Sequence, residues 1–229
     1  MILLAIDTSG RDGSIALARK AGDANAAGAA LPSVEVLDLV PLEGGTFSAQ
    51  LVPQIAALLQ KHGLTKKHID GFAVASGPGS FTGLRVGLAA VKGLAEILAK
   101  PVVAVSRLEV VARSGKHQGK VISALDAGRS DVYLGEYDLS ERASLTVERL
   151  VSREEFLSTA RETKVVTPER VLVEAANSAG LSVEEVAPPN STAIARIGFE
   201  KIMRRETISP EDLDANYIRR SDAEIFAKK

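Results

Sequence analysis

The sequence lacks cysteine altogether, and it lacks the features of membrane and secreted proteins. None of its 229 residues is a cysteine, which excludes disulfides and thiolate chemistry and fits a reducing compartment. No apolar run approaches the roughly 20 residues that a membrane-spanning helix needs. The N-terminus, MILLAIDTSG, has no basic segment before its apolar residues, so we predict a strand there rather than a signal peptide. We therefore expect a cytoplasmic protein with no membrane contact.

An excess of positive charge is also missing. The chain has 28 lysines and arginines against 29 aspartates and glutamates, for a formal net charge of -1. No bulk positive field is present to hold nucleic acid by counterion release. The pairs Arg204-Arg205 and Arg219-Arg220 are more typical of solvated faces than of RNA sites. We therefore expect any RNA contact to be local or to be made by a partner.

Motifs for metal binding and nucleophilic catalysis are scarce as well. The histidines are His62, His68 and His117, and no two of them have the spacing of a helical metal site. No H-E-x-x-H and no G-x-S-x-G sequence occurs. We expect no bound metal and no protease chemistry.

The chain contains a weak internal repeat. In MILLAIDTSGRDGSIALA an apolar run ends at Asp7, before a turn and a second strand, and KVISALDAGRSDVYLGEYD repeats this order around Asp126. Two unrelated hairpins would look similar, but the repeat favours two similar halves that divide between Val105 and Gly119. We assign residues 1–105 to an N-terminal lobe and 106–229 to a C-terminal lobe, with the last residues as candidates for packing back on the first lobe.

The two aspartates occupy equivalent places, each at the end of an apolar strand. A carboxylate at such a place can hold a metal-bound phosphate, which would suit an independent ATP-dependent phosphotransferase of the sugar-kinase type. The simpler interpretation is that Asp7 and Asp126 each cap their own turn. The second half also has no Gly-Gly loop for an adenine base where VEAANSAGL stands, which argues against the phosphotransferase.

A glycine-rich motif, ASGPGSFTGLRVGLAAVKGLA, follows the expected strand 69–75 and leads into an expected helix from Ser80 to about Ala99. Its glycines fall as G-x-G-x-x-x-G, one residue too long for the dinucleotide fingerprint. A Walker loop is excluded because Leu84, not lysine, follows Gly83. Both standard nucleotide motifs are therefore absent.

Three glycines of this motif share one face of the helix. Gly79, Gly83 and Gly87 are spaced by four residues. A glycine in a helix interior costs about 1 kcal/mol relative to alanine, so the stripe should serve the close approach of another backbone. Internal packing, the expected helix Ser48–Gly63 of this chain, another copy and a different protein all fit the pattern.

The remaining elements are predicted from periodicity and caps. The helix at Ser48–Gly63 has apolar positions Leu51, Val52, Ile55, Leu58 and Leu59. We expect a strand over 145–151, a helix from Ser152 with Glu155 at its capping-box position, helices over 169–178 and 192–205, and an extended arm at the end of the chain.

The run GPGSFTGLRVGLAAVKGLA resembles, almost residue for residue, the signature of the TsaB (YeaZ) family of tRNA threonylcarbamoyladenosine biosynthesis. Other matches follow in the family's order over nearly the whole chain: AIDTS, SAQLVPQIAALL, VSRLEVVA, LDAGRSDVYLGEY and NYIRRSDAE. The resemblance implies an α/β, actin-like fold of the ASKHA type, with two ribonuclease-H-like lobes whose mixed sheets are flanked by helices.

The resemblance also implies a non-catalytic role. In the family this subunit is a scaffold that activates TsaD, which transfers threonylcarbamoyl from its AMP adduct onto N6 of the adenosine next to the anticodon. The expected partners are TsaD in a heterodimer, TsaE in a ternary complex and a second copy of the chain when TsaD is absent, with tRNA contacted mainly through the complex. No cofactor is expected on this chain alone, and ATP or ADP is assigned only to the interface of the complex.

The family's interface helices map onto Ser48–Gly63 and Ser80–Ala99. The resemblance predicts these partner-interface residues: Leu51, Ile55, Leu58, Gly79, Gly83, Leu84, Gly87 and Ala90. It leaves Asp7, Asp126 and Arg129 as candidate vestigial or interface nucleotide contacts, with no catalytic and no metal-binding residue.

The chain departs from the family pattern at two places. Phe47-Ser48 stands where the family often has His-Ser, so no role for a histidine is carried over. Gly128 stands at the first arginine of the family's Asp-Ala-Arg-Arg, with Arg129 at the second. A contact made by the first arginine is therefore lost here or taken over by Arg129.

Overall fold

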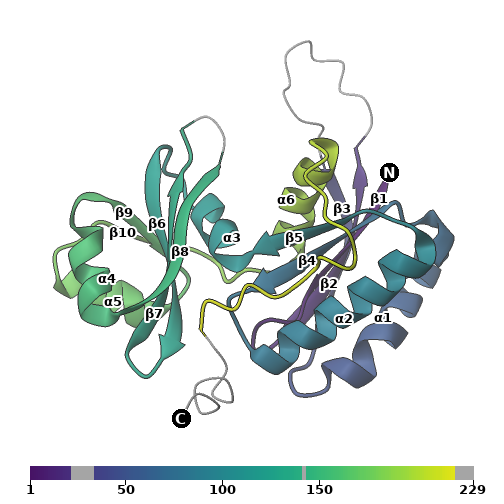
Figure 1. The fold of residues 1–229 in the computed structure, drawn as a ribbon, viewed down its shortest axis with the longest axis horizontal. Helices are drawn as coiled ribbons and strands as arrows, with labels where there is room; N and C mark the ends of the chain where they lie inside the picture. The colour runs from purple at the N-terminus through teal and green to yellow at the C-terminus, as the bar shows by residue number, and fades with distance from the viewer. Residues whose placement is uncertain (22–33, 141–142, 220–229) are drawn as a thin grey trace. The chain divides into compact units, whose positions relative to one another are not determined.

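The computed structural model describes residues 1–21, 34–140 and 143–219, and these form two compact units (Figure 1). The first unit consists of Met1–Val105 and Asn190–Ala215, and the second of Ser106–Pro189 and the segment that begins at Asn216. Each unit has its own five-stranded mixed sheet with helices packed on it. The expected α/β fold with two mixed sheets flanked by helices is confirmed.

The first sheet has the strand order β3-β2-β1-β4-β5. Its strands are β1 (Ile2–Asp7), β2 (Gly13–Lys20), β3 (Val34–Leu42), β4 (Gly71–Gly77) and β5 (Val102–Ser106). Strand β2 is antiparallel to β1 and β3, whereas β4 is parallel to β1. The helices of this unit are α1 (Phe47–Lys61), the short 3-10 helix η1 (Lys66–His68), α2 (Phe81–Leu98) and α6 (Ser191–Met203).

Alternate residues of β4 show which helix covers which face of the first sheet. Phe72 and Val74 are buried in one hydrophobic cluster with residues of α1 and α2. Ala73 points to the other face, where a Cβ on Gly198 of α6 would lie 2.4 Å from the Ala73 Cβ. The glycine therefore lets α6 approach the sheet closely, and helices cover both faces.

The second sheet has the strand order β10-β9-β6-β7-β8. Its strands are β6 (Lys120–Gly128), β7 (Asp131–Asp138), β8 (Ser144–Ser152), β9 (Lys164–Thr167) and β10 (Val183–Glu185). Its helices are α3 (Arg107–Ser114), α4 (Arg153–Thr159), the 3-10 helix η2 (Ala160–Glu162) and α5 (Arg170–Ser178). Val121 and Leu125 pack with α3, and the alternate residues Ile122 and Ala124 pack with α4 and α5, so helices again cover both faces.

The two sheets have the same topology. In each, the first strand lies between the second, which is antiparallel to it, and the fourth, which is parallel. Asp7 ends the first strand of one sheet, and Asp126 lies near the end of the first strand of the other. The internal repeat expected from the sequence is therefore present in the fold.

The assignment of the C-terminal segment differs from the sequence-based division, which placed all of 106–229 in the second lobe apart from its last residues. Helix α6 contacts β1, β2 and β4 of the first unit. Farther along, the Ile208 N–H donates to the Val102 carbonyl at 2.9 Å, and Leu213 is buried. The chain thus returns to the first unit before Asn216, and residues 220–229 lie outside the described part. No helix in that part is both long enough and apolar enough to cross a membrane.

Candidate functional site

The glycine motif packs against the turn that joins β1 and β2. A Cβ built on Gly83 would lie 2.0 Å from the Thr8 carbonyl oxygen, and one on Gly87 would lie 2.4 Å from the Thr8 Oγ1. A Cβ on Gly79 would lie 2.3 Å from the Ser9 carbonyl oxygen. A methyl group at any of these places would overlap its neighbour. The close backbone that the stripe predicts is thus the chain's own turn.

Hydrogen bonds fasten α2 to the same turn. The Ser80 N–H donates to the Ser9 carbonyl at 2.7 Å, and the Thr8 hydroxyl donates to the Gly83 carbonyl at 2.7 Å. The Ser80 hydroxyl caps the helix by accepting the Gly83 N–H at 3.2 Å. The resemblance places Gly79, Gly83 and Gly87 in the partner interface, whereas these contacts place them against the chain's own turn, which is the internal packing that the spacing left open.

All four of the larger side chains predicted at the interface are also internal. Leu51 is 1% exposed, and Leu58 and Leu84 are each 2% exposed. Ile55 is buried with them in the cluster beneath α1 and α2. The physical reason is that the regular apolar stripe of each helix is needed to cover the helix's own sheet. Any partner must therefore meet a different side of these helices.

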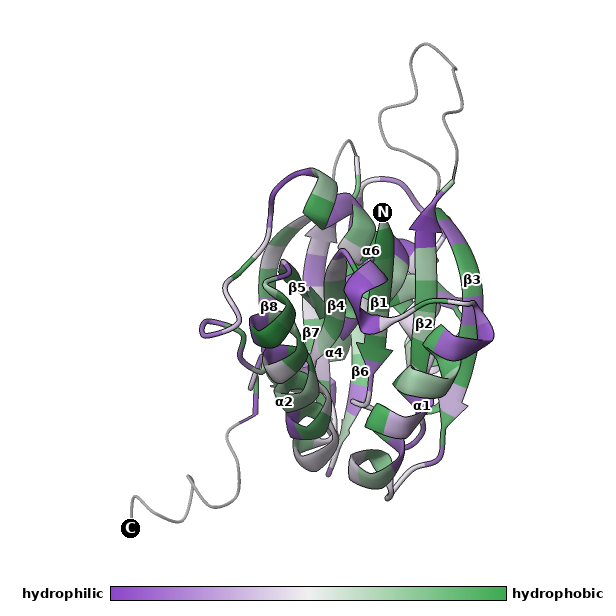
Figure 2. Ribbon diagram, turned by 90° about the vertical axis from the view of Figure 1, so that its right-hand side faces the viewer, coloured by the Kyte–Doolittle hydropathy of each residue, from purple (hydrophilic) through white to green (hydrophobic). Residues whose placement is uncertain are grey.

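That other side carries exposed apolar residues, which we call the outer helix surface. On α2, Ala89, Gly93 and Ile97 are exposed at a spacing of four residues, and Ile97 is 77% exposed. On α1, Val52 is 60% exposed, with Ala49 and Ala56 exposed at the same spacing. Figure 2 shows hydrophobic segments along both helices. None of the eight residues predicted at the interface is exposed on this surface, and Ala90 is half-buried and packs against the core cluster.

Val52 and Ile97 are exposed, but neither is among the residues predicted at the interface. Val52 directly follows the core residue Leu51, so a one-residue step on the helix turns it away from the sheet. The usable signal is the presence of large apolar residues outside the main stripe. That signal identifies an exposed apolar face without naming what covers it.

Asp7 caps its own turn. The carboxylate is 4% exposed, and its Oδ1 accepts the Ser9 N–H at 2.9 Å and also the Ser9 hydroxyl. The Asp7 carboxylate thus caps its turn, as the simpler interpretation of the sequence expects, and its Oδ1 is not left open for a metal.

Asp126 caps the corresponding turn of the second unit. It is exposed, and its Oδ1 accepts the Gly128 N–H at 3.2 Å. Gly128 and Arg129 both have positive φ, at 70° and 56°, and Arg129 is exposed. No group of three metal-ligating side chains occurs among the residues that the structure describes. Asp7 belongs to one unit, and Asp126 and Arg129 belong to the other.

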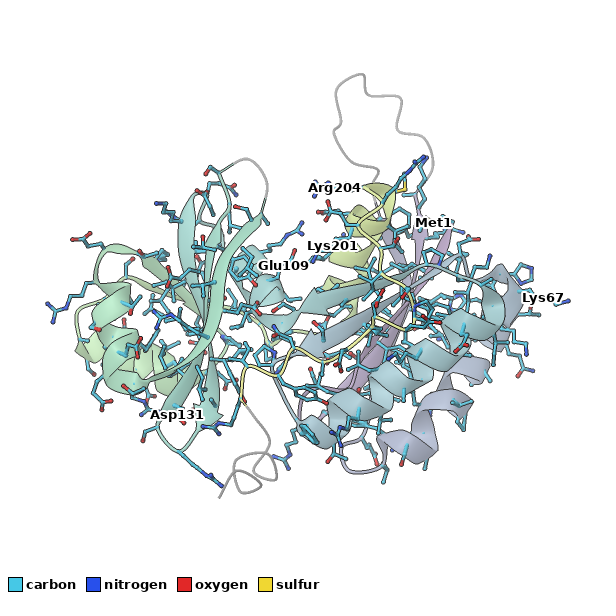
Figure 3. All side chains as sticks on the ribbon, in the orientation of Figure 1. Met1, Lys67, Glu109, Asp131, Lys201 and Arg204 are labelled. Carbon is cyan, nitrogen blue, oxygen red and sulfur yellow. The ribbon has the colours of Figure 1, made fainter. Side chains whose placement is uncertain are left out.

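Arg219, which the sequence pattern favours as part of a solvated face, instead makes specific contacts at the β6–β7 turn. Its guanidinium donates to the Ala127 carbonyl at 2.8 Å and pairs with Asp131, which is labelled in Figure 3. Arginine suits both acceptors because its planar fork presents several donors. No local sequence rule links residues so far apart in the chain, so only the fold could reveal this contact.

Comparisons with known proteins give a consistent picture. The family model of TsaD, tRNA N6-adenosine threonylcarbamoyltransferase, matches residues 44–216. The tRNA threonylcarbamoyladenosine biosynthesis protein TsaB of Bacillus subtilis is 34% identical over 138 residues, covering 60% of this chain and 55% of the relative. TsaB of Haemophilus influenzae is 26% identical over 239 residues, covering 96% of this chain and 94% of the relative.

A solved structure agrees with these relatives. YeaZ from Pseudomonas aeruginosa superposes with a TM-score of 0.69 at 27% identity, covering 94% of this chain and all of the other. The similarity thus extends across both units in sequence and in fold.

Proposed function

The chain belongs to the family described by the TsaD model, with TsaB and YeaZ proteins as its relatives, and from this premise we propose that it is a non-catalytic subunit in tRNA threonylcarbamoyladenosine biosynthesis. It binds TsaD in a heterodimer and keeps TsaD competent to modify N6 of the adenosine next to the anticodon. TsaE joins the pair in a ternary complex. The names of the relatives support a role in threonylcarbamoyladenosine biosynthesis. The match to the TsaD model supports pairing with TsaD, because two chains of related fold can pair through equivalent helices.

The observation that carries the pairing is the outer helix surface. Ile97 is 77% exposed and Val52 is 60% exposed on two helices that contact each other. Burying a large aliphatic side chain fully is worth about 1.5 to 3 kcal/mol relative to leaving it in water. Beside Ile97, a Cβ on Gly93 would meet no heavy atom within 4 Å outside its own helix, so a partner helix can approach closely there. In the absence of TsaD, a second copy of the chain covers the same surface.

The turn at Asp7 supports a non-catalytic role over the phosphotransferase alternative. A phosphotransferase would need the Asp7 carboxylate for a metal-bound phosphate, whereas here its Oδ1 takes both the N–H and the hydroxyl of Ser9. The Thr8 hydroxyl is also engaged within the chain, because it donates a hydrogen bond to the Gly83 carbonyl. We infer that this chain alone holds no nucleotide and that ATP or ADP binds at the interface of the complex. Micromolar binding of Mg-ATP to the isolated chain in calorimetric titration would favour the phosphotransferase.

Charge placed on the outer helix surface tests the pairing. In Val52→Glu/Ile97→Glu, two carboxylates would have to lose their hydration in the interface, so we expect the affinity for the native TsaD to fall about tenfold or more. The matched control is Val171→Glu, which changes an exposed valine of α5 in the second unit. Affinity is measured by calorimetry with purified TsaD, and thermal unfolding confirms that each variant is folded. Normal pairing by the double variant would exclude this surface.

A further inference from the structure

A hollow lined by basic residues lies in the second unit and shares no residue with the outer helix surface. It has a volume of about 610 Å³, and its charged lining consists of Lys116, Lys120, Arg161, Lys164, Glu162 and Glu184. It lies where the parallel strands β6, β9 and β10 begin, at Lys120, Lys164 and Val183. The turn at Asp126 lies at the opposite, carboxyl end of β6. The hollow is therefore separate from the site that the repeat of aspartates suggests.

The charge of the hollow differs from that of the whole chain. Its lining has four lysine and arginine side chains against two carboxylates, whereas the chain as a whole has a formal charge of -1. Both carboxylate oxygens of Glu184 accept the backbone N–H of Lys116, at 3.1 and 3.2 Å, so one of the two acids fastens the loop that carries Lys116. The positive charge is thus local and held in place by the fold.

Three of the cations have no carboxylate partner within the described ranges. No salt bridge joins the side chains of Lys116, Lys120 or Arg161 to an acid there. The residue paired with Lys120 on the neighbouring strand β7 is an acid, Asp138. Its pKa is lowered mainly by its hydrogen bonds to Ser140 and to a smaller extent by Lys120. These side chains remain available to an anion from solution.

The ligand that fits this lining is a phosphodiester. Lysine offers a point charge and arginine a planar fork, both suited to phosphate oxygens. Thr163 and Ser182 add hydroxyl groups, and the Ser182 hydroxyl is already hydrogen-bonded to the Lys164 Nζ at 3.2 Å. The lining contains no phenylalanine, tyrosine or tryptophan on which a base could stack. The chemistry therefore favours a nucleic-acid backbone over its bases.

The exposure of the lining favours a long ligand over a small one. Lys116, Lys120 and Arg161 are all exposed, whereas a small-molecule site normally buries most of its ligand. We propose that this basic hollow binds backbone phosphates of tRNA and so gives the subunit an RNA contact of its own. The inference rests on the proposed function, which supplies tRNA as the substrate of the complex.

The test removes two positive charges from the hollow and compares the loss with the same change elsewhere. Lys116→Gln/Lys120→Gln alters the hollow and leaves the Lys116 backbone N–H in place. Lys66→Gln/Lys67→Gln is the matched control, because both lysines are exposed on η1 of the first unit, where Figure 3 labels Lys67. Binding of a fluorescent tRNA is followed by anisotropy between about 50 and 200 mM salt, with the full chain alone and with TsaD.

We expect the hollow variant to bind tRNA about tenfold more weakly at the lowest salt. Each lost phosphate contact should also reduce the slope of log K against log salt by about 0.7 to 0.9. The control should retain the wild-type affinity and slope. The proposal is overturned by equal binding of the hollow variant and the wild type, by an equal loss in the control, or by a wild-type chain that binds no tRNA in either setting.

A competition experiment separates RNA from small anions. Inorganic phosphate at low millimolar concentration and constant ionic strength should leave bound tRNA in place, and displacement would mark the hollow as a small-anion site instead. TsaD pairing is measured separately for the same variants. Weakened tRNA binding with intact pairing supports both inferences. Intact pairing with unchanged tRNA binding overturns only the role of the hollow. A wild-type chain that does not pair with TsaD but still binds tRNA more tightly than the hollow variant overturns only the proposed function.

Discussion

Gly83 and Gly93 lie on the same helix but in different surroundings. A Cβ on Gly83 would lie 2.0 Å from the Thr8 carbonyl oxygen, whereas a Cβ on Gly93 would meet no heavy atom within 4 Å outside its own helix. The first position is fixed by packing, and the second is open. Substitution at Gly83 therefore measures the free-energy cost of steric overlap, and substitution at Gly93 measures the intrinsic cost of glycine in a helix.

We predict opposite effects of alanine at these two positions. Gly83→Ala should lower the free energy of unfolding by about 1 to 3 kcal/mol, because the β1–β2 turn must move to admit the methyl group. Gly93→Ala should raise it by up to about 1 kcal/mol, since alanine is the better helix former. Urea unfolding of both variants measures the difference. A Gly83→Ala variant as stable as the wild type would show that the turn is not tightly packed on α2.

The glycine spacing could predict a close backbone approach, but it could not identify the neighbour. Thr8 lies 75 residues before Gly83 in the chain, and their contact depends on β1 and β4 being adjacent in the sheet. The roles of Asp7 and Asp126 were predictable as alternatives, because a carboxylate before a turn caps it in many proteins. The structure supports the capping alternative for both.

At the scale of elements, Asp38 ties β3 to the end of α1. Its Oδ2 accepts from the Lys61 Nζ at 2.6 Å and lies 3.0 Å from the His62 Nε2. The hydrogen bond from Lys61, followed by that from His62, lowers the pKa of Asp38 from 3.8 to about 2. The carboxylate form is therefore favoured in the folded protein.

This pKa predicts a loss of stability in acid. A carboxyl whose pKa is lower in the folded chain stabilises the fold above its unfolded pKa of 3.8, and that contribution is lost as the pH falls towards about 2. Asp38→Asn should therefore lower the melting temperature at pH 6, and the difference from the wild type should shrink between pH 4 and pH 2. Thermal unfolding across this range checks it. A difference that stays constant with pH would mean that the Asp38 carboxylate does not contribute.

The helices could be predicted more reliably than the sides that they expose. α1 and α2 begin and end within two residues of the expected positions, because Ser80 caps α2 and Gly63 follows α1. A helix covering a sheet and a helix covering a partner have the same apolar periodicity. The family resemblance therefore places Leu51 and Leu84 in an interface, whereas in the structure they belong to the core.

At the scale of the whole molecule, Glu148 accepts hydrogen bonds from both residues at which the chain enters the second unit. Its Oε1 accepts hydrogen bonds from the hydroxyls of Ser106 and Tyr137, and its Oε2 accepts one from the Asn216 side chain. Ser106 and Asn216 are the first residues of the two segments that make up this unit. Burial raises the pKa of Tyr137, so its hydroxyl stays protonated and donates to the carboxylate.

Loss of this carboxylate should weaken the second unit. Glu148→Ala leaves the buried Tyr137 hydroxyl without its acceptor, so we expect a loss of about 1 to 3 kcal/mol in urea unfolding. Glu148→Gln keeps an acceptor oxygen and should cost less. Glu174→Ala is the control, because Glu174 pairs with Arg170 on an exposed helix face and should change stability by less than about 0.5 kcal/mol. Equal stability of Glu148→Ala and the control would show that the contact is incidental.

The internal repeat was predictable, but the path of the chain after it was not. The strand orders of both units match the two halves inferred around Asp7 and Asp126. The return of α6 to the first sheet depends on the close contact between Gly198 and Ala73, which no local pattern reveals. The basic hollow likewise joins the α3–β6 loop, η2 and the start of β9, and no single stretch of sequence contains its charge.

The most direct test of the central claim is reconstituted tRNA modification by the native TsaD and TsaE, with and without this chain. With a threonylcarbamoyl donor and ATP, we predict that threonylcarbamoyladenosine forms only when the chain is present. The chain supplied without TsaD should form none. Equal modification by TsaD in the absence of the chain, or modification by the chain alone, would contradict the account of a non-catalytic activating subunit.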